Sequence, residues 1–244
     1  MSNTYQHAAN FYDLDYQYAA DIPFFRRYAQ NGPVLELACG TGRVSIPLAQ
    51  SGLRVHGLDL SPQMLDVFRA KLPQLAPDVR DRISITQGNM ASFDLGEKFP
   101  LIIIPFRSFQ ALTEDADIAG CLQDARNHLA KDGRFIINCF VPQKGMRKWC
   151  YPEKTHWERD GVSCKSFGER IDTKRQIIYP VMVYEHGENQ RIEEPLTLKY
   201  WYPRKLRKVL RDAGFRIVEQ YGDYDGGKIK RHGGEQIYVC EVAR

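Results

Sequence analysis

Residues 34–42 read Val34-Leu35-Glu36-Leu37-Ala38-Cys39-Gly40-Thr41-Gly42, a short apolar strand that runs directly into a glycine turn. Apolar residues at helical spacing after Arg43 predict a helix, and Gly52 is placed to end it. A turn between a strand and a helix leaves backbone amides free, and glycine lets a ligand approach without a Cβ in the way. The segment therefore predicts a binding site for polar or anionic ligand groups.

An acidic residue, Asp59, follows Gly40 by nineteen positions and ends a second predicted strand over residues 54–60. A carboxylate at that place can accept hydrogen bonds from both hydroxyls of a ribose. The turn and Asp59 together predict a nucleoside-containing cofactor. The run Gly40-Thr41-Gly42-Arg43-Val44-Ser45 has serine where a dinucleotide-binding turn has glycine or alanine, which weakens a nicotinamide or flavin interpretation.

Strands and helices alternate along the first 140 residues. Short helices are expected between residues 11 and 30, strands at 34–37, 54–60, 83–87, 101–105 and 134–140, and helices at 43–51, 61–72 and 113–130. This alternation predicts a doubly wound parallel sheet with right-handed crossovers. Stretches rich in β-forming residues at 176–184 and 196–201 predict an antiparallel insertion. A helix at 202–213 and strands at 215–221 and 236–242 follow.

The composition is that of a globular chain, with 43% hydrophobic and 26% charged residues. No apolar run is long enough to span a membrane, and residues 1–10 lack the features of a secretory signal, so we expect a cytoplasmic protein. Six cysteines without metal-ligand spacing predict free thiols and no metal site. The net charge is +6 after residue 140 and −2 before it. A solvated basic face, an anionic substrate or a nucleic-acid partner would each explain this asymmetry.

Several motifs carry a family resemblance. Residues 36–42 resemble motif I of the class I S-adenosylmethionine-dependent methyltransferases, in which an acidic residue and two small or apolar residues precede GxGxG or CGTG. Residues 57–65 resemble the second motif, and residues 87–93 the third, with Asn89 in place of the usual aspartate. Residues 105–112 resemble the fourth motif. The tyrosine-rich start and the insertion are most similar to the small-molecule branch that contains the sugar N,N-dimethyltransferases of macrolide biosynthesis.

The resemblance implies an α/β fold: a doubly wound, mostly parallel seven-stranded sheet with its last strand antiparallel, and an antiparallel β insertion after strand 5. It also implies three regions, namely an N-terminal helical lid (1–30), a Rossmann-like core (31–140 and 202–244) and an insertion (141–201) that forms part of the acceptor pocket. The implied cofactor is S-adenosyl-L-methionine, which leaves as S-adenosyl-L-homocysteine.

The resemblance also implies roles for single residues. Glu36 would order the turn and reach the methionine amino group, or alternatively form a buried ion pair. Asp59 would hold the ribose, and Asn89 would accept from the adenine amino group. The cofactor-binding residues expected in this way are Tyr12, Glu36, Ala38, Cys39, Gly40, Gly42, Asp59, Leu60, Met64, Asn89, Met90, Pro105 and Phe106. Plain core packing is the alternative for Met64 and Met90.

Methyl transfer from a sulfonium is an in-line displacement with a neutral leaving group, so alignment and electrostatics matter more than acid catalysis. Three catalytic candidates follow. Arg107 could pair with a carboxylate or phosphate of the acceptor or with the cofactor carboxylate, or form a surface salt bridge. His156 would serve as a base for a hydroxyl acceptor, or is a surface histidine. Tyr18, like Tyr12, would touch cofactor or substrate from the lid, or only fasten an N-terminal helix.

We therefore expect methyl transfer to nitrogen or oxygen of a small-molecule acceptor. An RNA or protein methyltransferase is the alternative that the basic C-terminal part suggests, and a nicotinamide-dependent oxidoreductase or nucleotide-binding module is the third. The expected partners are a small-molecule acceptor, no nucleic acid and no membrane, with the chain a monomer or homodimer. The sequence does not identify the acceptor.

Overall fold

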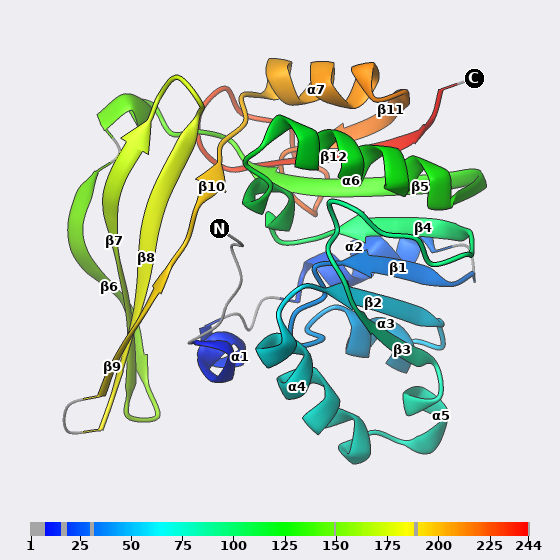
Figure 1. Cartoon of the computed structure of the whole chain (residues 1–244), viewed down its shortest axis with the longest axis horizontal. Coiled ribbons are helices and arrows are strands. Elements are labelled where there is room, and N and C mark those ends of the chain that lie inside the picture. Colours follow the sequence, from blue (N-terminus) through cyan, green and yellow to red (C-terminus); the bar gives the residue numbers. More distant parts are fainter. Residues whose placement is uncertain (1–7, 16–18, 30–31, 149, 188–189, 244) are drawn as a thin grey trace.

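The computed structural model describes residues 8–15, 19–29, 32–148, 150–187 and 190–243. It contains two sheets with helices around the larger one (Figure 1). The larger sheet has seven strands in the order β11-β12-β5-β4-β1-β2-β3. These strands are β1 (Val34–Leu37), β2 (Val55–Asp59), β3 (Ile83–Gln87), β4 (Phe99–Ile104), β5 (Leu129–Phe140), β11 (Phe215–Tyr221) and β12 (Glu235–Val242). Within the sheet only β12 is antiparallel to its neighbours, which confirms the predicted fold.

Helices cover both faces of this sheet. They are α1 (Tyr12–Asp15), α2 (Asp21–Tyr28), α3 (Ser45–Gln50), α4 (Pro62–Lys71), α5 (Pro77–Arg80), α6 (Asp115–His128) and α7 (Pro203–Asp212), with 3₁₀ turns η1 (Ala9–Phe11), η2 (Leu72–Gln74), η3 (Ser108–Ala111) and η4 (Met146–Lys148). Successive residues of β4 alternate between the two cores: Ile102 packs in the core shared with α6 and α7, and Ile103 in the core shared with α2 and α3. Both faces of the large sheet are thus covered by packed helices.

Element boundaries agree with the sequence except where turns are ambiguous. Ser61 caps α4 as predicted, since its hydroxyl accepts from the Met64 N–H at 3.2 Å and Pro62 occupies the first turn. The helix predicted at 113–130 is shorter, and the turn predicted at 131–133 belongs to β5. Leu129 already pairs with Phe99, and Asp132 turns the strand with φ of +59°. Sequence patterns fail here because β5 contains an irregularity.

The second sheet is the antiparallel insertion. Its strands are β6 (Tyr151–Arg159), β7 (Val162–Asp172), β8 (Ile177–His186), β9 (Gln190–Pro195) and β10 (Leu198–Lys199). They pair in the order β10-β8-β7-β6, and β9 also pairs with β8. Strand β8 matches the predicted stretch at 176–184, whereas the stretch at 196–201 contains only the two residues of β10. Strands β6, β7 and β9 were not predicted individually, and the sequences of β6 and β9 are largely polar.

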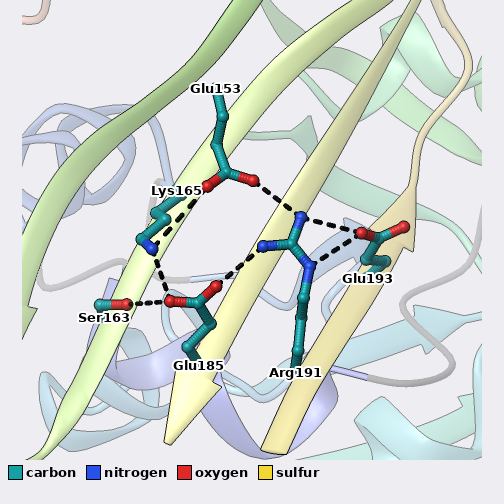
Figure 2. A network of polar contacts seen from close by, with 6 residues as sticks. All are labelled: Glu153, Ser163, Lys165, Glu185, Arg191 and Glu193. Carbon is teal, nitrogen blue, oxygen red and sulfur yellow. Dashed lines mark hydrogen bonds and ion pairs between the residues drawn. The ribbon is translucent and has the colours of Figure 1, made fainter. Parts of the chain in front are cut away.

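One face of the small sheet carries a charged network that crosses four strands (Figure 2). Arg191 pairs with Glu153, Glu185 and Glu193, and Lys165 bridges Glu153 and Glu185. These side chains are partly exposed, so this face is in contact with solvent. Buried apolar residues lie on both faces, since Val183 is directly opposite Lys165 on the charged face and Tyr184 lies on the other face. The face opposite the network, with Cys164 and Tyr184, packs against Ala8 and Phe11 near the N-terminus.

Two buried glutamines join the small sheet to the large one. The Gln110 amide donates to the Lys199 carbonyl at 3.0 Å and accepts from the Phe140 N–H at 2.9 Å. The Gln236 amide donates to the carbonyls of Trp201 at 2.7 Å and Phe140 at 3.0 Å. Both glutamines are fully buried, and buried amides are stable only when paired. These bonds fix the insertion at the end of β5.

No helix in the described part of the chain is both long and apolar enough to cross a membrane.

Candidate functional site

The glycine turn after β1 has a left-handed backbone, and side chains of α4 pack closely against it. Gly40 and Gly42 have φ values of +55° and +82°. A Cβ on Gly42 would lie 2.4 Å from Cε2 of Phe68 on α4, and one on Gly40 would lie 3.0 Å from Cε of Met64. Ala38 is also left-handed, with φ of +59°. Such a turn, held against α4, presents backbone rather than side chains to a ligand.

Asp59 lies at the end of β2 and ties the glycine turn to that strand. The Gly40 N–H donates to Asp59 Oδ2 at 2.8 Å, and the Ser61 N–H donates to Oδ1 at 2.8 Å. Burial raises the pKa of the Asp59 carboxyl, and these backbone hydrogen bonds act in the opposite direction. Each carboxylate oxygen can accept two hydrogen bonds, so acceptor capacity remains for a pair of hydroxyls.

Glu36 is buried beneath the turn. Its Oε2 accepts a hydrogen bond from Ser45 Oγ at 2.5 Å. Burial raises the pKa of Glu36 to about 8, although Ser45 and the charge of Arg43 act in the opposite direction. With a raised pKa the buried carboxyl holds its proton near neutral pH, and a cation placed beside it would lower the pKa and favour the carboxylate. It is thus suited to respond to an ammonium group at the turn.

An ion pair that was not predicted from the sequence lies beside the turn. Both terminal nitrogens of Arg43 donate to the fully buried Asp21 of α2, at 3.0 and 2.6 Å. The Arg43 guanidinium also lies 4.7 Å from the ring centre of Phe106, at the exit of β4. Arg43 therefore links the glycine turn, α2 and the fourth motif. Its position directly after Gly42 was the available signal.

The adenine side of the predicted site has one exposed apolar residue, Leu60, with 38% of its surface accessible beside Asp59. Met64 and Cys39 are instead buried under the turn, where Cys39 packs with Phe68. An exposed leucine next to the Asp59 carboxylate provides a surface for a flat ring, so the residues present fit a nucleoside.

The third motif forms a short turn at the end of β3. Asn89 is exposed, and its Oδ1 accepts from the Ala91 N–H at 2.9 Å, whereas Met90 is buried in the core. The amide group of Asn89 thus shapes this turn with its oxygen and keeps two N–H donors. Packing is what the structure shows for Met90.

The N-terminal segment bridges the turn and the small sheet. Asp13 accepts from Thr41 Oγ1 at 2.6 Å and pairs with Lys71 at 2.5 Å. Residues 8–15, which we call the strap, also contact the small sheet: the Ala8 N–H donates to the buried Glu194 at 3.0 Å, and Phe11 stacks on Tyr184 with ring centres 5.4 Å apart. Figure 1 shows α1 between the small sheet and α4.

Two of the expected residues, Tyr12 and Tyr18, belong to this N-terminal region. Tyr12 lies in the strap and is half-buried. Tyr18 lies outside the described residues. Their predicted contacts with cofactor or substrate stay predictions.

The fourth motif forms a strained exit from β4. Pro105 is buried, and Phe106 and Arg107 have φ values of +53° and +69°. Arg107 forms an ion pair with Glu235 at the start of β12, and the Asn138 amide donates to the same carboxylate at 2.9 Å. Arg107 therefore makes the salt bridge that the sequence left as the alternative to a catalytic role. Phe106 connects this motif to the glycine turn through its contact with Arg43.

A hydrogen-bonded chain lies on the face of the small sheet opposite the charged network. The buried Ser166 Oγ lies 2.7 Å from Nε2 of His156 and 2.9 Å from the hydroxyl of Tyr151. Cys164, two residues before Ser166 on β7, packs with Ala8 of the strap, so this face looks toward the strap. The sequence offered His156 alone, because only strand register brings Ser166 and Tyr151 beside it.

A mixed sheet of this order with a ligand-ready turn after β1 defines a Rossmann-like enzyme that binds a nucleoside cofactor. Comparison with known proteins identifies the family. A family model described as a methyltransferase domain matches residues 34–133. The putative methyltransferase YqeM of Bacillus subtilis (strain 168) is 46% identical over 201 residues, which cover 80% of this chain and 78% of that protein. The chain belongs to the class I S-adenosylmethionine-dependent methyltransferases, whose cofactor is S-adenosylmethionine.

Two further relatives bear on the fold and the acceptor. The structure of the CcbJ methyltransferase from Streptomyces caelestis superposes with a TM-score of 0.86 at 25% identity, covering 98% of this chain and 97% of that one. A dTDP-3-amino-3,6-dideoxy-alpha-D-glucopyranose N,N-dimethyltransferase of Streptomyces fradiae is 29% identical over 155 residues. That match covers 59% of this chain and 54% of the relative, so this chain spans about half the length of that relative.

Proposed function

We propose that this protein transfers a methyl group from S-adenosylmethionine to an amine nitrogen of a small molecule. The observation that carries the proposal is the strap, which contacts the glycine turn through Asp13 and the small sheet through Ala8 and Phe11. A donor bound at the turn and an acceptor bound against the small sheet would share the space beneath it. The amino-sugar acceptor in the name of the Streptomyces fradiae relative favours nitrogen over oxygen.

The chain's own residues supply binding and alignment. S-adenosylmethionine supplies an electrophilic methyl group on a sulfonium, whose leaving group departs neutral. Asp59 would hold the ribose hydroxyls, Glu36 would take the ammonium of the methionine part, and Leu60 would cover the adenine. Alignment of this kind replaces the entropy cost of bringing two reactants together, which is a large part of the barrier for a displacement.

The chain Tyr151–Ser166–His156 serves the acceptor. As the new N–C bond forms and the C–S bond breaks, the product ammonium must lose a proton. Tyr151 accepts this proton while it passes its own to Ser166, and Ser166 passes its hydroxyl proton to Nε2 of His156. Hydroxyl groups can donate and accept at once, and His156 is exposed, so the proton then reaches solvent.

A screen of amine, hydroxyl and carboxylate metabolites for release of S-adenosylhomocysteine tests the proposal. We expect turnover with primary or secondary amines, amino sugars among them, and none with matched alcohols. Turnover confined to hydroxyl acceptors, or to RNA or protein substrates, would contradict it.

The proton path has its own test in Ser166→Ala. This change breaks both hydrogen bonds, so we expect kcat to fall by about 100-fold, the lower end of the usual contribution of proton transfer. We also expect the pH at which the rate is half-maximal to shift. Ser163→Ala, on the same strand but on the charged face, is the matched control. An unchanged pH profile in Ser166→Ala would remove the relay.

A further inference from the structure

We propose that the cleft between α6 and α7 is a second ligand site that binds a small amphipathic anion. The cleft has a volume of about 880 Å³, within the range of small-molecule sites. Its walls come from α6, α7, Trp201 and the turn between β7 and β8 (residues 173–176). The glycine turn, Asp59 and the β4 exit do not line it. The site is therefore separate from the cofactor site.

The floor of the cleft is apolar. Ile118 and Leu122 of α6, Val209 and Ala213 of α7, and Trp201 line it. Ile118, Leu122 and Trp201 belong to the buried core of this face, and Val209 and Ala213 pack against that core. A ligand on this floor would remove the accessible apolar surface of Val209 and Ala213 from water, which favours a hydrocarbon or aromatic body.

The rim of the cleft is rich in cations. Five basic side chains line it against three acidic ones: Lys174, Arg175, Lys199, Lys205 and Lys208 against Glu114, Asp115 and Asp212. Each acid already pairs with one cation, as Arg175–Glu114, Lys199–Asp115 and Lys208–Asp212. Among the described residues, Lys174 and Lys205 have no carboxylate partner, and the Lys205 ammonium donates to the amide oxygen of Gln176. The excess positive charge favours an anion.

An unpaired donor in the cleft wall gives independent support. Trp201 is 4% exposed, and its indole N–H finds no acceptor among the described residues. Buried N–H groups are almost always paired, so one without a partner calls for an explanation such as a missing ligand. An anionic oxygen would accept from it, with the nearby Lys199 ammonium, 5.5 Å from the indole ring centre, as counter-charge.

These features together specify a ligand with one anionic end and one apolar body. Octanoate is a suitable probe, and octanamide and octylammonium have the same chain with a neutral or a positive end. Calorimetry with the full chain should show saturable octanoate binding at least tenfold tighter than octanamide binding, with no binding of octylammonium. Equal affinity for octanoate and octanamide would overturn the proposal, as would the absence of octanoate binding.

Two variants locate the site. Trp201→Phe keeps the ring but removes the N–H, and Lys205→Met keeps most of the stem but removes the charge. We expect each to weaken octanoate binding about fivefold or more, whereas Lys131→Met, an exposed lysine outside the cleft, leaves it unchanged. Octanoate binding that neither variant alters, or that S-adenosylhomocysteine displaces competitively, would overturn the assignment.

The outcome is independent of the proposed methyl transfer. Affinity for S-adenosylhomocysteine should be the same in wild type, Trp201→Phe and Lys205→Met, which also shows that the variants are folded. If Trp201→Phe loses that affinity, the result for Lys205→Met decides the question. Failure of the amine screen with octanoate binding intact would contradict the function and leave the second site in place.

Discussion

At the scale of single residues, Asp59 holds the Gly40 N–H, and in the proposed function its remaining lone pairs accept from a ribose. Asp59→Ala should weaken binding of S-adenosylhomocysteine by about 100-fold or more, since two hydrogen bonds to a charged group contribute about 1.5–3 kcal/mol each. Isothermal calorimetry measures the change. Asp66→Ala, an exposed aspartate on α4, is the matched control. Undiminished affinity in Asp59→Ala would refute the assignment of the ribose site.

Glu36 predicts a pH dependence of stability. Its pKa of about 8 in the folded state exceeds its ordinary value of 4.5, so between these pH values the folded protein holds a proton that the unfolded chain has released. Stability should therefore fall as the pH rises through this window, by up to about 1.4 kcal/mol per pH unit relative to Glu36→Gln. Urea unfolding of the ligand-free protein from pH 5.5 to 8.5 measures it. Parallel curves for wild type and variant would contradict the raised pKa.

The sequence identified the residues around the glycine turn, but it did not show which of them are buried and which are open to a ligand. The acid, glycine and acid pattern of Glu36, Gly40 and Asp59 located the turn, because each of these positions needs one particular side chain or none. The pattern could not separate contact from packing. Cys39 and Met64 lie under the turn because α4 packs there, and this packing depends on the tertiary structure.

At the scale of elements, the strap connects two parts that are distant in the sequence. Asp13→Ala removes its hydrogen bond to Thr41 and its pair with Lys71. The pair is partly exposed and contributes little to global stability, about 1 kcal/mol or less. We therefore expect a melting temperature within a few degrees of wild type and an affinity for S-adenosylhomocysteine about three- to tenfold weaker. Thermal melting and calorimetry measure both quantities.

Asp117→Ala on α6 controls for the loss of an acidic side chain far from the strap. A variant Asp13→Ala that binds S-adenosylhomocysteine as tightly as wild type would show that the strap does not cover the cofactor.

Element prediction succeeded where burial leaves a pattern. The strands β1, β3 and β11 were predicted with the boundaries that the structure shows, because β1 is mostly apolar and β3 and β11 mix β-branched or aromatic residues with polar ones. Strand β6 has exposed side chains along most of its length, and its hydrogen bonds are made to β7 rather than dictated by its own residues. Polar edge strands of this kind leave no periodic signal.

At the scale of the whole molecule, the two sheets depend on the buried amides that join them. Gln236→Leu would leave the carbonyls of Trp201 and Phe140 without this donor and remove one of the two acceptors of the Tyr238 hydroxyl, the other being the Pro203 carbonyl. Unpaired buried groups cost about 1–3 kcal/mol each, so we expect a loss of about 2–4 kcal/mol in unfolding free energy. Urea denaturation measures it. Gln50→Leu on α3, an exposed position, should change stability by less than about 0.5 kcal/mol. A fully stable Gln236→Leu would mean that the sheets associate without these bonds.

The sequence by itself determined the core fold, the family and the position of the glycine turn. Each of these depends on local requirements: alternating hydrophobic patterns, a turn that tolerates only glycine, and a carboxylate at one strand end. Tertiary structure decided the rest. The strap's contacts with Thr41 and Glu194, the approach of Ser166 to Tyr151 and His156, and the pairing of Arg107 with Glu235 all join residues that are far apart in the chain or are brought together by strand register. Such contacts depend on how strands pair and sheets dock, and neither is encoded in any single segment.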